Sequence, residues 1–444
     1  MSNQDSYVVL MSPNNIVRRH LEEVSKENNV EYRLSDFVIS QEVDNGTLCY
    51  SSLTGSLILV RDFNKAKDFL ISERILVKTD EEEKDFVDNL RKYYSTIPFE
   101  AKECNYYHIL TTTGCNASCF YCYEKHYKKQ TMNSATARKT AEYIIEHYTG
   151  KQVCLHWFGG EPLVNIKAID IITGLLRKAD IDFISEITTN GYLFTPKLFE
   201  KCTQLWNLRK AIITVDGTED VYNTTKYYSA VGNTSPYQVV LTNIDRLATT
   251  GINIIIRTNI GPFNINCVRE LYEELKVRYL AYENISVHPH IIANPPGNDI
   301  YLTQDDRRQI YNVISELKKP WNDRARIIRT IYELPGFTSG RGIEFTGERV
   351  VIKPDGTLAL NPDMFDDECF GSITDGFQVD EGRLSQYLKK EETTICMKCP
   401  LYPSCFKREI SFYTTVCTKV DYEKCIDNSI KSMLSIYQLI KDCI

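Results

Sequence analysis

The sequence predicts an α/β protein whose main domain is a parallel sheet flanked by helices. First, apolar runs rich in isoleucine, valine and threonine alternate with amphipathic stretches between residues 104 and 310, a pattern typical of parallel βα units. Second, polar residues stand where these runs end, and such sheets place ligand groups at the carboxyl ends of their strands. These polar residues are Glu161, Asn190, Asp216, Arg257 and His288.

The composition is that of a globular protein with a substantial core. The chain has 444 residues, 43% of them hydrophobic and 25% charged, which allows two or three domains. A net charge of −7 argues against general nucleic-acid binding. No apolar run reaches the roughly 18 residues of a membrane span and no signal-peptide pattern is present, so we expect a cytoplasmic protein. Its 15 cysteines then point to metal or redox chemistry rather than disulfides.

The first hundred residues predict a small α+β region. An Asn45-Gly46 pair between the strand-like runs 37–43 and 47–52 predicts a hairpin, because both turn positions favour positive φ. Cys49 stands alone and is interpreted as a buried hydrophobic residue. The other predicted elements are helices at 15–28, 64–73 and 80–94 and strands at 56–60 and 74–78.

Three cysteines follow the first strand of the main domain, residues 106–111. Cys115, Cys119 and Cys122 have C-x3-C-x2-C spacing, and three thiolates from one loop can hold three irons of a [4Fe–4S] cluster and leave the fourth iron open. The alternatives are a structural zinc knuckle or a group of inert buried thiols.

Further strands and helices alternate after this loop. The strands are predicted at 153–158, 183–191, 209–217, 252–259 and 285–291. The helices are predicted at 133–148, 165–178, 195–205, 237–250 and 265–278, with Asn133 or Ser134 as the first N-cap. His156, His288 and His290 are interpreted as core residues rather than as a catalytic base.

A Gly159-Gly160-Glu161-Pro162 segment follows the second strand. Its glycines allow a close backbone approach to a ligand, and its carboxylate can accept hydrogen bonds from an ammonium group. A plain turn is the alternative.

The C-terminal region combines a hairpin with a second group of cysteines. Residues 350–360 predict a hairpin around Pro354-Asp355-Gly356. Cys396, Cys399 and Cys405 follow at C-x2-C-x5-C spacing, and Cys417 and Cys425 come after them. Four thiolates suit a closed iron–sulfur cluster that relays electrons or tunes potential, and a four-cysteine zinc ribbon is the alternative.

The order of these motifs resembles that of radical S-adenosylmethionine (SAM) enzymes. Tyr121 before the third cysteine, Thr189-Asn190-Gly191 and the stretch 215–226 also match family patterns. The resemblance implies a partial (β/α)6 barrel, a [4Fe–4S] cluster whose open iron binds SAM, and a cofactor site that is made up of Tyr121, Gly159, Gly160, Glu161, Pro162, Thr189, Asn190, Asp216, Lys226 and Arg257.

The stretch 215–226 departs from the family pattern at two positions. Tyr222 stands where the family has histidine, and Lys226 stands where it has arginine. Lysine cannot form a planar bidentate fork with a carboxylate, so Arg257 is the alternative ligand for the SAM carboxylate.

The terminal regions resemble two appendages of peptide-modifying radical SAM enzymes. Residues 346–444 resemble the SPASM extension, which implies that a final cysteine before the last helix joins Cys396, Cys399 and Cys405 as the fourth ligand, with Cys425 favoured over Cys417. Asn361, Gly376 and Glu409 stand where further cysteines are usual, so we expect one auxiliary [4Fe–4S] cluster. Residues 1–100 resemble a winged-helix-like domain that binds a leader peptide as an added strand. The predicted domains are therefore 1–100, the core 104–310, a bridge 311–345 and the extension 346–444.

The resemblance implies a maturase of a ribosomally made peptide. A 5′-deoxyadenosyl radical would abstract hydrogen from a precursor residue and a crosslink would follow, with a cysteine thioether as the leading product. The expected partners are a precursor peptide with its leader and a reductant such as flavodoxin or ferredoxin, with no nucleic acid or membrane. The alternatives are an anaerobic sulfatase-maturing enzyme that forms formylglycine and a non-catalytic iron–sulfur or zinc scaffold that binds a peptide.

Overall fold

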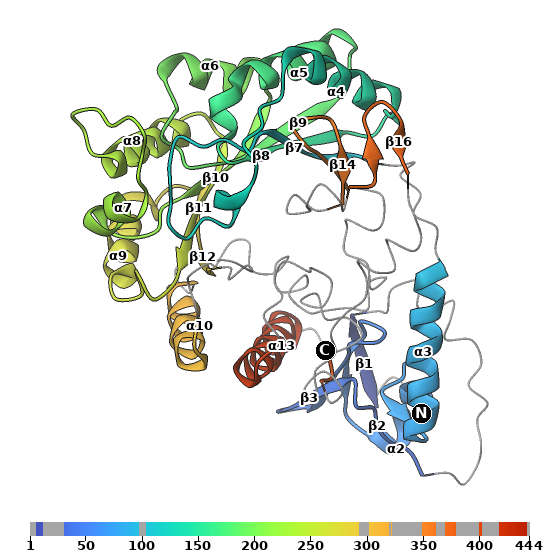
Figure 1. Cartoon of the computed structure of the whole chain (residues 1–444). Coiled ribbons are helices and arrows are strands. Elements are labelled where there is room, and N and C mark those ends of the chain that lie inside the picture. The colour runs from blue at the N-terminus through green and yellow to red at the C-terminus, as the bar shows by residue number, and fades with distance from the viewer. Residues whose placement is uncertain are drawn as a thin grey trace. The chain divides into compact units, whose positions relative to one another are not determined.

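The computed structural model describes nine stretches of the chain, and the chain divides into two compact units (Figure 1). The described residues are 6–11, 31–96, 104–292, 302–318, 321, 349–360, 369–378, 399–401 and 417–441. One unit comprises residues 1–98, 322–342 and 388–444, and the other comprises 99–321 and 343–387. The predicted domain 346–444 is thus shared between them.

The larger unit contains an eight-stranded sheet in the order β12-β11-β10-β9-β8-β7-β13-β14. The six strands β7 to β12 are parallel to their neighbours, which confirms the predicted partial (β/α)6 barrel. They are β7 (Tyr106–Thr112), β8 (Val153–Gly159), β9 (Phe183–Thr189), β10 (Leu208–Thr214), β11 (Asn253–Ile260) and β12 (Ile285–Ile291).

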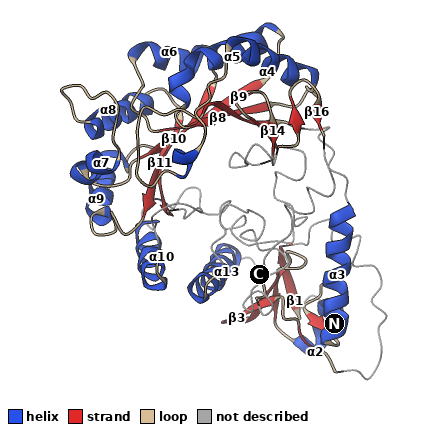
Figure 2. Cartoon of the chain, viewed as in Figure 1, coloured by secondary structure: helices blue, strands red, loops and turns tan. Residues whose placement is uncertain are grey.

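Helices cover the outer face of this sheet (Figures 1 and 2). They are α4 (Ser134–Glu146), α5 (Ile166–Lys178), α6 (Pro196–Gln204), α7 (Glu219–Thr225), α8 (Pro236–Ala248), α9 (Val268–Tyr279) and α10 (Gln304–Lys318). Asn133 caps α4 as predicted, because its side chain accepts hydrogen bonds from the Ala135 and Thr136 amides. The short helix α7 was not among the predicted elements.

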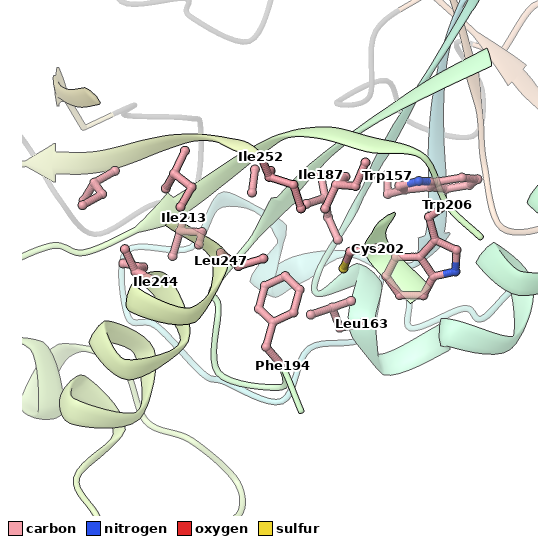
Figure 3. Close-up of a cluster of buried hydrophobic side chains, with 14 of the residues drawn as sticks. Trp157, Leu163, Ile187, Phe194, Cys202, Trp206, Ile213, Ile244, Leu247 and Ile252 are labelled. Carbon is pink, nitrogen blue, oxygen red and sulfur yellow. The ribbon is translucent and has the colours of Figure 1, made fainter. Parts of the chain in front are cut away.

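The core lies between the sheet and these helices. Alternate strand residues point outward, and Trp157, Ile187 and Ile213 are fully buried there (Figure 3). Leu163, Phe194 and Leu247 pack in the same cluster, as Figure 3 shows. The opposite face carries polar residues instead, such as Glu186, Lys210 and Arg257, which are partly exposed. The inner face is therefore not a second apolar core.

The predicted C-terminal hairpin joins the barrel sheet. Strand β13 (Arg349–Ile352) pairs in parallel with β7, and β14 (Leu358–Ala359) pairs antiparallel with β13. Val350 and Ile352 are fully buried in the cluster that holds the outward residues of β7. Apolar burial therefore attaches the hairpin to the barrel.

The smaller unit contains an antiparallel sheet in the order β1-β5-β4-β3. The strands are β1 (Tyr7–Met11), β3 (Val38–Val43), β4 (Gly46–Ser51) and β5 (Leu57–Val60), and β2 (Arg33–Leu34) pairs with β6 (Leu76–Val77). Helices α2 (Phe63–Ser72) and α3 (Asp80–Thr96) confirm the predicted helical segments. Helix α13 (Lys419–Ile440) contributes Met433 and Tyr437 to a core cluster with Leu48 and Tyr50.

The hairpin at Asn45-Gly46 is confirmed, but its predicted turn is wrong by one residue. Val43 pairs with Gly46, so the turn residues are Asp44 and Asn45, and neither has positive φ. Gly46 lies in the strand with φ of 141°, where a Cβ atom would lie 2.3 Å from the Val60 carbonyl oxygen. The glycine is needed for the close approach of β5 rather than for a turn.

Several predictions lie outside the described residues. They are the helix at 15–28, most of the bridge 311–345, Asn361, Cys396, Cys405 and Glu409.

Candidate functional site

The cysteine loop begins at the carboxyl end of β7 and is tied down on both sides. The Thr113 amide donates to the Gln130 carbonyl at 2.9 Å, so the two ends of the loop lie together. The Ser118 amide donates to the Tyr227 carbonyl at 2.6 Å, which links the middle of the loop to the segment after α7. The three cysteines are thus held above the edge of the sheet where parallel strands end.

The three cysteines of the loop are exposed or partly exposed as whole residues, although their thiol groups are largely shielded from water. Cys115 is exposed, and Cys119 and Cys122 are partly exposed. The Ala117 backbone nitrogen lies 3.3 Å from the Cys115 sulfur, and the Asn190 side-chain nitrogen Nδ2 lies 3.8 Å from it. Burial raises the pKa of the Cys115 thiol to about 11 and that of Cys122 to about 12. The thiols are therefore protonated, and a metal would have to displace their protons.

The donor set fits a cluster held by three thiolates. In the described part of the chain, no group of three or more cysteine, histidine or carboxylate side chains is gathered closely enough to hold a metal ion. The three sulfurs come from one loop but are not preassembled, so a cluster would have to gather them on binding.

Gly159 and Gly160 bring the end of β8 against the cysteine loop. A Cβ atom on Gly159, whose φ is 119°, would lie 2.0 Å from the Thr112 carbonyl oxygen. A Cβ atom on Gly160 would lie 2.4 Å from the Gly114 carbonyl oxygen. The close approach that these glycines allow is therefore an approach to the protein's own backbone next to Cys115.

The Glu161 carboxylate is fully buried and links β8 to β9. It accepts hydrogen bonds from the Thr189 hydroxyl at 2.8 Å, the Asn190 amide at 2.7 Å and the Leu163 amide at 3.0 Å. Burial raises its pKa to about 6, although these donors act in the opposite direction. The carboxylate therefore fixes the Thr189-Asn190 turn beside the loop, and the Asn190 side chain donates to Asn116 Oδ1 at 2.8 Å.

Asp216 joins the cysteine loop to the ends of β10 and β11. Its carboxylate accepts a hydrogen bond from the Tyr121 hydroxyl and lies 3.2 Å from the Lys226 ammonium nitrogen. The Asn259 amide donates to it at 2.6 Å. Burial would lower the pKa of Lys226, but Asp216, Tyr222 and Cys119 together outweigh burial and raise it. Both side chains are therefore fully paired within the protein.

The two departures from the family pattern pack against each other. The Lys226 nitrogen lies 4.9 Å from the centre of the Tyr222 ring, a cation–π contact, and the Tyr222 hydroxyl bonds that of Tyr228 at 2.7 Å. Arg257 is partly exposed on the inner face of β11, in register with Thr214 and His288.

Three residues of this site were missed by sequence reasoning. Asn259 and Asn264 hold Asp216, and the Phe263 ring stacks on that of Tyr121 with centroids 5.1 Å apart. Asn259 lies at the end of a predicted strand, as Asp216 does, and its position there could have marked it as a candidate site residue. Asn264 and Phe263 carry no sequence signal.

The histidines differ in their surroundings. His156 is buried and bonds the Tyr106 hydroxyl at 2.8 Å and the Thr188 hydroxyl at 2.9 Å, which confirms it as a paired core residue. His288 and His290 are partly exposed on the inner face of β12, so their prediction as core residues is wrong.

Of the described C-terminal cysteines, Cys399, Cys417 and Cys425 lie in the smaller unit and Cys369 lies in the larger one. Cys399 and Cys425 both pack against the cluster that contains Leu48 and Met433. Cys425 lies inside α13, so the prediction that it precedes the last helix is wrong, whereas Cys417 does precede this helix.

Comparison with known proteins identifies the class of the barrel. Residues 109–275 match the Radical SAM superfamily. These residues include the cysteine loop and the strands β8 to β11, so this part of the chain is similar to radical SAM enzymes.

The curated relatives match parts of the chain. The Radical SAM cyclopropyl synthase TigE of Paramaledivibacter caminithermalis is 30% identical over 147 residues, 27% of this chain and 30% of TigE. The GTP 3',8-cyclase of Clostridium perfringens is 25% identical over 225 residues, 50% of this chain and 65% of the cyclase. The chain thus spans about a third of one relative and about two thirds of the other.

Solved structures share the fold over a longer range. The structure of anSMEcpe with bound AdoMet and the Cp18Cys peptide has a TM-score of 0.58 at 13% identity, covering 76% of this chain and 99% of that one. Streptococcus suis SuiB bound to S-adenosylmethionine has a TM-score of 0.51 at 12% identity, covering 88% and 98%. At these identities the likeness shows the fold alone. No described helix has the length and apolar character needed to cross a bilayer.

Proposed function

We propose that the chain is a radical SAM maturase that modifies a ribosomally made precursor peptide. The observation that carries this proposal is a C-x3-C-x2-C loop at the carboxyl edge of a parallel sheet, within residues that match the Radical SAM superfamily. When bound, SAM and a [4Fe–4S] cluster supply the radical that abstracts hydrogen from the substrate. The proposed product is a crosslink within the peptide, and a thioether at a cysteine is the leading candidate.

The residues of the barrel edge hold these groups. Cys115, Cys119 and Cys122 bind the cluster. The partly exposed backbone at Gly159 and Gly160 lies beside the loop, and its carbonyl groups are suited to the SAM ammonium group. Glu161 fixes the Asn190 turn, because its own acceptor oxygens are occupied by protein donors.

A peptide is the proposed substrate. Among the structural neighbours, anSMEcpe is described with a bound peptide. The inner face of the barrel is polar and partly exposed, as at Glu186 and Arg257, which suits a chamber that admits polar groups. The antiparallel sheet of the smaller unit has β1 and β3 as edge strands within the described residues, and an edge strand can pair with an added peptide strand.

The C-terminal cysteines are proposed to hold one auxiliary [4Fe–4S] cluster. Cys396, Cys399 and Cys405 have C-x2-C-x5-C spacing in the sequence. Cys425 packs against the same core cluster as Cys399, which favours Cys425 over Cys417 as the fourth ligand. A small electron carrier such as flavodoxin or ferredoxin would reduce the enzyme.

Anaerobic reconstitution tests the proposal. We expect about eight irons per chain, four for each cluster, and cleavage of SAM to 5′-deoxyadenosine under dithionite. Replacing Cys115, Cys119 and Cys122 by alanine should remove about four irons and all SAM cleavage, whereas Cys154→Ala should change neither. Cys425→Ala and Cys417→Ala, compared for iron content, identify the fourth auxiliary ligand.

The substrate is tested with candidate short peptides encoded beside the gene. A mass loss of two hydrogens supports a crosslink. The alternative activity, formation of formylglycine as in sulfatase maturation, would instead give an aldehyde at cysteine or serine. Zinc binding without SAM cleavage would show a non-catalytic scaffold and overturn the proposal.

A further inference from the structure

A buried ion pair, Asp216 and Lys226, contacts the middle of the cysteine loop through Tyr121. Tyr121 lies between Cys119 and Cys122, and its hydroxyl donates to Asp216. Asp216 is fully buried, and the side chain of its partner Lys226 is 2% exposed. A buried pair of this kind can hold a loop only if every polar group in it is satisfied.

The Lys226 ammonium has no donor left for a ligand. Lysine carries three N–H donors. The Lys226 nitrogen lies 3.2 Å from Asp216 Oδ2 and donates to both the carbonyl and the hydroxyl oxygen of Thr214, at 2.9 Å in the first case. All three donors of Lys226, which stands at the family's arginine position, are therefore bound to protein oxygens.

The Asp216 carboxylate is saturated in the same way. A carboxylate offers about four acceptor positions. Tyr121 and Lys226 contact Oδ2, and the amide and side-chain nitrogens of Asn259 donate to Oδ1 at 2.6 and 3.1 Å. A cofactor could reach this carboxylate only by displacing a protein donor.

Arg257 has the opposite character. It is partly exposed on the inner face of β11, two residues before Asn259. Within the part of the chain that the structure describes, its guanidinium makes one hydrogen bond, from Nε to Asn259 Oδ1 at 3.0 Å. Its two Nη groups remain available, and a guanidinium can bind a carboxylate through two parallel hydrogen bonds.

We propose that Lys226 and Asp216 are positioning residues that hold the cysteine loop through Tyr121, and that Arg257 is the cation that receives the SAM carboxylate. This inference rests on the proposed function, because it presumes that the loop carries a cluster and binds SAM. In this arrangement Lys226 takes the position of the family's arginine next to Asp216, and Arg257 binds the SAM carboxylate.

The experiment compares cluster retention with SAM affinity in the anaerobically reconstituted full chain. The variants are Lys226→Met, Tyr121→Phe and Arg257→Met, with Arg269→Met as a control because Arg269 forms an exposed ion pair with Glu316. Retention is the rate of iron release to a chelator. Affinity is the SAM Kd per loaded cluster, measured by equilibrium dialysis and by the SAM-induced change in the electron paramagnetic resonance spectrum of the reduced cluster.

We expect the two sets of variants to change different quantities. Lys226→Met should release iron at least about tenfold faster and Tyr121→Phe should do so more weakly, with a SAM Kd within about twofold of the wild type. Arg257→Met should raise the SAM Kd at least about tenfold, as expected for the loss of charge-assisted hydrogen bonds, with unchanged iron release. Arg269→Met should change neither quantity.

The reverse pattern would overturn the inference. It fails if Lys226→Met raises the SAM Kd while the cluster is retained, or if Arg257→Met leaves the Kd unchanged. If Lys226→Met does not fold, Tyr121→Phe tests the loop contact alone, and normal iron release in that variant rejects it. A wild-type chain that binds no SAM would instead refute the proposed function.

Discussion

At the scale of single residues, the site depends on charges that are buried and paired within the protein. Lys226 and Asp216 are almost fully buried, whereas Arg269 and Glu316 form an ion pair in which both side chains are more than half exposed. Removing one partner of a buried pair leaves an uncompensated charge, but an exposed pair is screened by water. The two pairs therefore differ in what they contribute to stability.

We expect Lys226→Met to lower the free energy of unfolding of the metal-free chain by about 3–5 kcal/mol. Arg269→Met should lower it by at most about 1 kcal/mol. Denaturant titration followed by tryptophan fluorescence measures both, since Trp157 and Trp206 lie in the barrel core. The double variant Asp216→Asn with Lys226→Met should be less destabilised than Lys226→Met alone. Equal losses for the buried and exposed single variants would contradict this interpretation.

Glu161 gives the barrel a pH dependence of a defined sign. Burial raises the pKa of its carboxyl from 4.5 to about 6, so in this window the folded state binds a proton that the unfolded state has released. The free energy of unfolding therefore falls as the pH rises from 4.5 to 6, by about 2 kcal/mol, and this contribution is constant above. Glu161→Gln should remove this component. A wild-type minus variant difference in unfolding free energy that does not change with pH would reject the assignment.

At the scale of elements, the ends of β7 and β8 come together because β8 ends in two glycines. A side chain at Gly159 would meet the Thr112 carbonyl oxygen, and a positive φ adds backbone strain. Gly174, inside α5, has no atom within 4 Å of the point that a Cβ would occupy, and so serves as a matched position. The first glycine is required by the site and the second is not.

Gly159→Ala should therefore lower the free energy of unfolding by at least about 3 kcal/mol, from strain and overpacking together. It should also speed iron release from the reconstituted chain, because Thr112 leads directly into the cysteine loop. Gly174→Ala should instead be neutral or stabilising by up to about 1 kcal/mol. Thermal unfolding and chelator challenge of the two variants check this contrast, which an equal response would refute.

The predictability of the elements follows from the range of the forces that form them. The six barrel strands and Asn133 as the cap of α4 were predicted because periodicity and capping are properties of neighbouring residues. The pairing of Val350 with Tyr107 joins residues far apart in the sequence and has no local signal. The saturation of Lys226 was equally hidden, because it depends on a backbone carbonyl at Thr214 that any residue could supply.

At the scale of the whole molecule, the two ends of the chain build one core. Strands β3 to β5 and helix α13 contribute Ile39, Leu48, Met433 and Tyr437 to the same apolar cluster. The Ser52 hydroxyl also donates to the Pro400 carbonyl, beside Cys399. The proposed auxiliary cysteines Cys399 and Cys425 therefore belong to the same compact unit as the N-terminal sheet.

Met433→Ala tests this shared core, because Met433 is fully buried in it. Truncation of a buried methionine costs about 2–5 kcal/mol, and the loss should appear in the sheet that shares the cluster although the change lies in α13. We expect faster amide hydrogen exchange in peptides from β3 to β5, with unchanged exchange in β7. Gln438→Ala, at an exposed position of the same helix, should leave both regions unchanged. Faster exchange confined to α13 would show that the N-terminal sheet is stable without the helix, and the auxiliary cysteines would then be independent of the proposed peptide-binding sheet.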